Sequence, residues 1–180
     1  MADTPRIGVI GLPGKWSSEA LADAVQARTG ERLLFDMTDV RLDLADNSLW
    51  HGDRNLCELD ALIVKKISAE YSPHTLDRLE LLRAAETAGV RVFSPALSIL
   101  RLIDRLSCTV TLRNAGIPMP ETRVTGNTAD AEKAVRDFGE AVFKPLYSTK
   151  ARGMCVLGAE RPGAELQARI EEFRSNNPDM

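Results

Sequence analysis

The chain has 180 residues, of which 44% are hydrophobic and 27% are charged, and its formal net charge is −3. This length suits one large domain, or one domain and part of a second. Because the chain has no basic excess and no apolar run long enough to cross a bilayer, we expect neither a nucleic-acid nor a membrane partner. The N-terminus also lacks the apolar core of a signal peptide, which indicates a cytoplasmic protein.

The cysteines and histidines give no sign of a metal site or of a disulfide framework. Cys57, Cys108 and Cys155 are odd in number and far apart, without a C-x-x-C pair. His51 and His74 have no partner at the spacing of metal ligands, so they are expected to be surface or loop residues. The sequence therefore predicts no metal ligand in this chain.

The first 95 residues alternate between predicted strands and helices. RIGVIGL at 6–12 is an apolar run typical of a central strand in a parallel sheet, and a turn follows at Pro13-Gly14. Further strands are predicted at 32–36, 60–67 and 91–93, and helices from Ser17, as the N-cap, to Gly30 and from Pro73 to Gly89. This alternation predicts an α/β domain with a Rossmann-like parallel sheet.

A hairpin is predicted between the second and third of these strands. VRLDL at 40–44 alternates between apolar and polar residues, and Asn47 marks a turn. The chain is then expected to return as a second strand over 48–53.

The pattern changes after residue 95, where we place the domain boundary. A helical stretch to Asn114 is expected to break near 101–104, and GIPMP at 116–120 ends it. The remaining predicted elements are a strand at 121–125, a helix capped by Thr128, two strands joined by a loop within 141–157, and a helix at 162–174. This order predicts an α+β unit over 96–180.

One predicted strand ends in a lysine. In AVFKPLYSTKARGMCVL, residues 141–157, an apolar run reaches Lys144-Pro145 before a small polar loop. Burying an ammonium group carries a large desolvation cost, so a lysine at the end of a strand either extends to water or meets an anion. The strand alone leaves both interpretations open.

The loop GLPGKW at 11–16 is a second candidate for anion binding. Its spacing does not match a Walker A motif, in which a Ser or Thr would stand at Trp16, or a dinucleotide fingerprint. The loop could still bind a small anionic substrate through Gly14 and Lys15, because it precedes a predicted helix. A plain sharp turn is the alternative.

A phosphorelay receiver domain is a rival interpretation, because such a domain also ends a strand in Lys-Pro. Receiver chemistry needs an acidic pair after the first strand and an acceptor aspartate after the third, to hold magnesium. This sequence has 11–15 (GLPGK) and Lys65-Lys66 at those places. The receiver reading is therefore rejected on charge.

Two longer stretches carry a resemblance to a known family. LIDRLSCTVTLRNAGIPMPETRVT at 102–125 and EAVFKPLYSTKARGMCVL at 140–157 together resemble the first half of an ATP-grasp ligase of the RimK-like kind. FKPLYSTKARGM is especially similar to the ATP-grasp proteins of the so-called GAK system. The resemblance implies a pre-ATP-grasp domain at 1–95 and the first ATP-grasp subdomain at 96–180.

The resemblance also implies which residues contact the nucleotide. Lys144 matches the strand lysine that meets the phosphates, and Arg105 replaces the upstream lysine of the family, which changes the geometry of the contact. The loop would close over the phosphates. The implied nucleotide contacts are Arg105, Lys144, Ser148, Thr149, Arg152 and Gly153.

The implied activity is an ATP-dependent carboxylate-amine ligation through an acyl phosphate. ATP and Mg²⁺ are the implied cofactors, and a small-molecule or peptide carboxylate and an amine are the implied partners. In the family the magnesium ligands, the adenine hinge and the catalytic residues lie beyond the position of Met180, so we expect an N-terminal fragment and nominate no catalytic residue. A non-catalytic scaffold or binding module is the alternative, and a homo-oligomer stays open.

Overall fold

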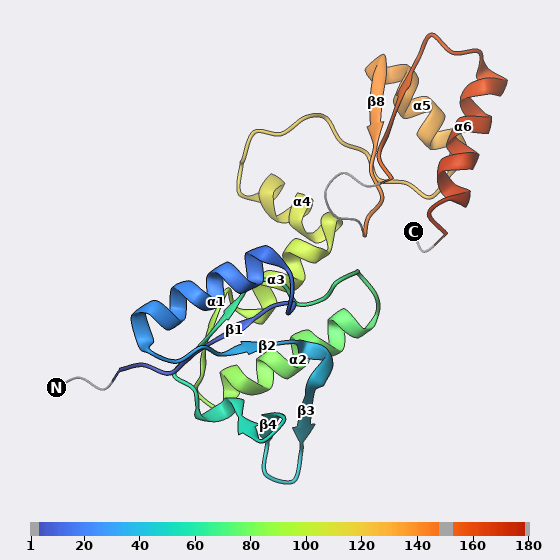
Figure 1. Cartoon of the computed structure of the whole chain (residues 1–180). Coiled ribbons are helices and arrows are strands. Elements are labelled where there is room, and N and C mark those ends of the chain that lie inside the picture. The colour runs from blue at the N-terminus through green and yellow to red at the C-terminus, as the bar shows by residue number, and fades with distance from the viewer. Residues whose placement is uncertain (1–3, 148–152, 179–180) are drawn as a thin grey trace. The chain divides into compact units, whose positions relative to one another are not determined.

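The computed structural model describes residues 4–147 and 153–178 (Figure 1). The chain divides into two compact units, Met1–Leu102 and Ile103–Met180. The division falls inside the helical stretch that follows residue 95, a few residues after the boundary expected from the sequence. No helix in the described ranges is long and apolar enough to span a membrane.

The first unit is built on a four-stranded parallel sheet in the order β2-β1-β6-β7. Its strands are β1 (Ile7–Ile10), β2 (Leu34–Phe35), β6 (Ala61–Val64) and β7 (Arg91–Phe93). Val9 on β1 pairs with Leu34 on one side and with Ile63 on the other. The prediction that the segments 6–12 and 60–67 are parallel members of one sheet is confirmed.

Helices α1 (Trp16–Thr29) and α2 (His74–Thr87) cover opposite faces of this sheet (Figure 1). The chain moves from β1 to β2 in one direction and from β6 to β7 in the other, and right-handed crossovers then place the two helices on opposite sides. Ala22 and Val25 of α1 pack on Val9 in the core. Helix α3 (Ala96–Ile103) follows β7.

The start of α1 differs from the prediction. Ser17 was expected to cap this helix, but the cap position is Lys15, which makes no side-chain cap bond. The next residue, Ser18, stabilises this connection: its buried Oγ accepts a 3.0 Å hydrogen bond from the Leu12 amide. This hydrogen bond joins the residue after β1 and Gly11 to the first turn of α1, and it therefore stabilises the connection between the strand and the helix.

The predicted hairpin is confirmed between β2 and β6. Strand β3 (Val40–Asp43) pairs antiparallel with β4 (Ser48–His51), and Asn47 takes the left-handed conformation with φ 55°. A short third strand, β5 (Arg54–Asn55), extends the hairpin into a meander. Two 3₁₀ turns flank it, η1 (Met37–Asp39) and η2 (Leu56–Glu58).

The second unit has one small antiparallel sheet and packs two helices on it. Its elements are α4 (Arg105–Asn114), α5 (Thr128–Phe138), β8 (Glu140–Phe143), β9 (Cys155–Gly158) and α6 (Gly163–Ser175). The core consists of Ala131, Val135, Leu157, Leu166 and Ile170. The predicted break before α4 is confirmed at Asp104, whose Oδ1 accepts a 3.0 Å bond from the Ser107 amide.

Two predictions for this unit are wrong. The segment 121–125, which the structure describes throughout, is not a strand. Its Arg123 pairs with Asp137 at 2.5 Å and lies 4.8 Å from the Phe138 ring, so the segment runs along α5 instead of joining the sheet. The cap of α5 is Asn127, not Thr128, because the Asn127 Oδ1 accepts bonds from two helix amides.

Candidate nucleotide-phosphate site

Strand β8 carries Lys144 to an exposed position. Phe143, the last strand residue, is partly buried against the core of this unit, whereas Val142 and Lys144 are exposed. Side chains alternate between the two faces of a strand, so Val142 and Lys144 share the face that α5 and α6 do not cover. The ammonium group of Lys144 is therefore accessible to solvent or to an anion.

The two ends of the loop between β8 and β9 lie close together. A Cβ atom added at Gly153 would lie 3.2 Å from Pro145 Cγ and 3.3 Å from Asn177 Oδ1, and Gly153 has φ +69°. Pro145 is buried, and the Phe143 and Phe173 rings pack edge to face at 5.4 Å. The end of β8 and the start of β9 are therefore held side by side, with Lys144 at their junction.

The loop between β8 and β9 contains four of the residues predicted to contact nucleotide. Three of them, Ser148, Thr149 and Arg152, lie outside the described residues. Lys144 and Gly153 are described, and they stand at the two ends of the loop. Glycine suits position 153, because a residue with a side chain is strained at φ +69°.

Arg105 is the first residue of α4, immediately after the Asp104 cap. It is partly exposed, and α4 has no buried residue and no extensive packing against the other described elements. Arg105 therefore has a defined position at the start of α4, but among the described residues α4 and β8 do not pack extensively against each other. The convergence of Arg105 and Lys144 on one phosphate stays a prediction.

Cys155 lies in the same strand pair, opposite Phe143. Burial raises the pKa of its thiol above the ordinary value, with Arg169 acting against this shift and Glu172 adding to it. A raised pKa keeps the thiol protonated at neutral pH, which argues against a nucleophilic role. Cys155 is a packing residue at the edge of the core.

The Gly14 amide, proposed from the sequence as an anion contact, already has an acceptor. It donates a 2.6 Å hydrogen bond to Glu19 Oε1, and Glu19 also pairs with Arg32. The Gly14 amide and then Arg32 hold the pKa of Glu19 below its ordinary value. An anion at Gly14 would have to displace the Glu19 carboxylate. The exposed Lys15 side chain forms no ion pair with Glu19 in the described part of the chain.

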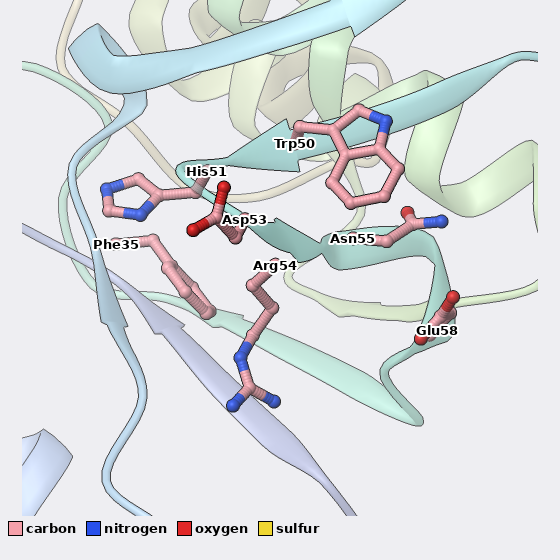
Figure 2. Close-up of a pocket in the computed structure, with 7 residues that line it drawn as sticks. All are labelled: Phe35, Trp50, His51, Asp53, Arg54, Asn55 and Glu58. Atoms are coloured by element: carbon pink, nitrogen blue, oxygen red, sulfur yellow. The ribbon is translucent and has the colours of Figure 1, made fainter.

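The first unit contains a pocket that the sequence did not indicate (Figure 2). It has a volume of about 590 Å³ and lies between the end of β2, the strands β4 and β5, and η2. Its lining is Phe35, Trp50, His51, Asp53, Arg54, Asn55 and Glu58. Several of these side chains make internal contacts: His51 packs on Phe35 at 5.1 Å and Arg54 pairs with Glu31 at 2.7 Å.

Within residues 4–147 and 153–178, no group of three or more His, Cys, Asp or Glu side chains could hold a metal ion. The described residues thus offer cations for phosphate and no ligand set for magnesium. The expectation that magnesium ligands would lie beyond Met180 stays a prediction.

No protein-family model matches the chain. Among curated proteins it is similar to the tetrahydromethanopterin:alpha-L-glutamate ligase of Methanosarcina acetivorans, with 27% identity over 154 residues, covering 82% of this chain and 48% of that ligase. The chain therefore spans about half the length of this relative.

The structure is similar to several ATP-grasp ligases. The ligase PsnB in complex with a minimal precursor matches with a TM-score of 0.71 and 19% identity over 94% of this chain and 62% of PsnB. A RimK domain ATP-grasp protein from Sphaerobacter thermophilus matches with a TM-score of 0.68 and 22% identity, covering 95% and 59%. These matches confirm the predicted fold: a parallel α/β unit followed by an α+β unit, as in part of an ATP-grasp ligase.

Proposed function

We propose that this chain, whose fold is that of ATP-grasp ligases of the RimK-like kind, supplies the phosphate-binding part of an ATP-dependent carboxylate-amine ligase. The observation that carries the proposal is the position of Lys144. Its ammonium group is exposed at the end of β8, beside a loop whose two ends are held together. A cation at this position can stabilise the negative charge of a nucleotide phosphate.

The proposed reaction has two steps. The substrate carboxylate attacks the γ-phosphorus of ATP, ADP leaves, and an acyl phosphate forms. An amine then attacks the acyl carbon, phosphate leaves, and the nitrogen loses a proton as the C–N bond forms. Lys144 would offset charge on the phosphates in the first step, and magnesium, when bound, would neutralise further charge.

The other predicted contacts belong to the same proposal. Arg105 would offer a bidentate guanidinium contact to phosphate, and Gly153 would let the loop backbone turn toward it. Ser148, Thr149 and Arg152 would complete the loop around the phosphates. Of the two residues expected to contact the substrate, Lys15 would do so, whereas the Gly14 amide already donates to Glu19.

The substrate classes follow from similar proteins. The curated relative is named as a glutamate ligase, and PsnB has been solved with a precursor peptide and AMPPNP and also with Mg and ADP. We extend these classes to this chain: an amino acid or a peptide, joined through an amide between a carboxylate and an amine.

The test is a calorimetric titration of the chain with ATP and magnesium. Lys144→Ala should weaken ATP binding by about tenfold, the loss expected for one charge-assisted hydrogen bond. Lys133→Ala is the matched control, since Lys133 is an exposed lysine of the same unit on α5. Its affinity should stay within about twofold of the parent, as expected for an exposed charge away from the site.

The thermal midpoint of Lys144→Ala should match the parent, because its side chain is exposed. Lys133→Ala also loses the ion pair with Asp137, so it serves as a control for ATP affinity alone. Equal ATP affinity in the parent and in Lys144→Ala would overturn the proposed role of this lysine.

A further inference from the structure

The carboxyl edge of the parallel sheet carries three lysines where the strand order reverses. Lys15 and Trp16 follow β1, and Lys65-Lys66 follow β6, the neighbouring strand. From β1 the chain crosses to β2 on one side, and from β6 it crosses to β7 on the other. In open parallel α/β sheets, ligands bind at the carboxyl ends of the strands at such a reversal.

The backbone holds these two segments together. The amides of Lys65 and Lys66 both donate to the Ile10 carbonyl, at 2.9 and 3.1 Å. The Lys15 amide donates to the Leu12 carbonyl at 3.1 Å, which closes the turn after β1. We call Lys15, Trp16, Lys65 and Lys66 the switch-point surface.

The lysines of this surface carry uncompensated charge. All three are exposed, and in the described part of the chain none belongs to an ion pair. The nearby carboxylates of Glu19 and Asp23 both pair with Arg32. Like charges gathered at one edge repel each other, so a multivalent anion that bridges them would be favoured.

Trp16 adds an apolar surface beside these charges. It is the first residue of α1, and 83% of its surface is exposed, the largest fraction among the exposed large hydrophobic side chains. It therefore contributes almost nothing to the core. An exposed indole next to cations suits a ligand with both an apolar part and anionic groups.

We infer that the switch-point surface binds a substrate with two or more carboxylates, whose apolar part contacts Trp16. The inference rests on the proposed ligase function in one respect, because a carboxylate-amine ligase must hold a carboxylate substrate. Carboxylate is favoured over phosphate because the Gly14 amide already donates to Glu19. The Leu12 and Lys15 amides also have acceptors, so this turn offers phosphate fewer backbone donors than a phosphate-binding loop does.

The two tryptophans provide an internal comparison for the test. Trp50 lies on β4, where its Nε1 donates to Ser48 Oγ at 2.7 Å, whereas Trp16 belongs to the switch-point surface. In a ¹⁵N-labelled chain, their indole signals would be followed during titration with citrate, glutarate, acetate or inorganic phosphate. Trp16→Phe assigns the signals.

The Trp16 signal should shift saturably with citrate and glutarate, and the Trp50 signal should not. Acetate, with one carboxylate, should bind at least about fivefold more weakly than citrate, because it can engage fewer lysines. Phosphate should also bind more weakly than citrate. Equal or tighter binding of phosphate, or equal shifts of both indole signals, would overturn the inference.

Variants test the lysines directly. The double variant Lys65→Ala/Lys66→Ala should weaken citrate binding by about fivefold or more. Arg91→Ala is the matched control: Arg91 is an exposed cation at the opposite, amino end of β7 in the same sheet. Unchanged citrate affinity in the double variant, or an equal loss in Arg91→Ala, would contradict the inference.

The result can be separated from the proposed function. The citrate titration contains no nucleotide, and Lys144→Ala should leave it unchanged. Citrate binding together with equal ATP affinity in the parent and in Lys144→Ala would support the switch-point surface while overturning the proposed phosphate site. ATP binding that Lys144→Ala weakens, without a citrate response at Trp16, would support the phosphate site while overturning the switch-point surface.

Discussion

Gly153 and Asn177 approach so closely that a Cβ atom added at Gly153 would lie 3.3 Å from Asn177 Oδ1. Asn177 is itself anchored, since its side-chain amide donates to the Phe173 carbonyl at 2.7 Å. The end of α6 thus supports the base of the loop that begins at Lys144. This relationship links the segment after α6 to the candidate phosphate site.

Gly153→Ala should destabilise the second unit by about 1 kcal/mol or more, because alanine is strained at φ +69°. The added methyl group would also press on Pro145 and Asn177. Urea unfolding measures the loss. Gly126→Ala is the matched control, since its Cβ would meet nothing within 4 Å and its φ is not positive. Equal stability of the two variants would contradict the proposed constraint.

Ser18→Ala should lower the free energy of unfolding by about 1–3 kcal/mol, because the buried Leu12 amide would lose its acceptor. Ser17→Ala tests the alternative that was expected from the sequence. Ser17 makes no cap bond, so this variant should stay within about 0.5 kcal/mol of the parent. A larger loss for Ser17→Ala than for Ser18→Ala would reverse the assignment.

Asp137 should contribute to stability in a pH-dependent manner. Lys133 and then Arg123 hold its pKa below the ordinary value, so its contribution is present above the unfolded-state pKa. That contribution is lost as the pH falls through the lower, folded-state pKa. The urea midpoints of the parent and Asp137→Asn should therefore differ at pH 7 and converge in acid.

The matched control for Asp137 is Glu140→Gln. Glu140 is exposed on β8 and, among the described residues, belongs to no ion pair. Its substitution should produce a smaller difference at pH 7. A gap between the parent and Asp137→Asn that stays constant down to pH 2 would exclude the ion pairs as its cause.

Arg105→Ala should weaken ATP binding by about tenfold if its guanidinium group meets the same phosphates as Lys144. Arg113→Ala is the matched control, because Arg113 lies in the last turn of the same helix. Calorimetry measures both variants, and the helix content by circular dichroism should not change. An unaltered affinity in Arg105→Ala would remove this residue from the proposed site.

Local patterns in the sequence predicted much of the fold correctly. The apolar runs predicted the parallel strands, Asn47 predicted the hairpin turn, and the break between α3 and α4 lies within the range 101–104 that was expected. These features depend on hydrophobic periodicity and on conformational preferences of single residues, which are encoded within a few positions. Lys144 could be singled out for the same reason, as a charge at the end of an apolar run.

Contacts between distant residues decided the rest. Alternation in ETRVT resembles a strand, but the ion pair of Arg123 with Asp137 and its contact with Phe138 hold the segment along α5. Likewise, the sequence of the turn after β1 resembles an anion site. In the structure, Glu19, which pairs with Arg32, already accepts the hydrogen bond from the Gly14 amide.

The sequence by itself therefore determined the order and type of most elements and the position of Lys144, because each of these depends on neighbouring residues. Only the tertiary structure decided which donors remain available to a ligand. Whether the Gly14 amide, Lys65 or Lys144 already has a partner depends on groups brought close by folding, and the spacing of residues along the chain does not record that.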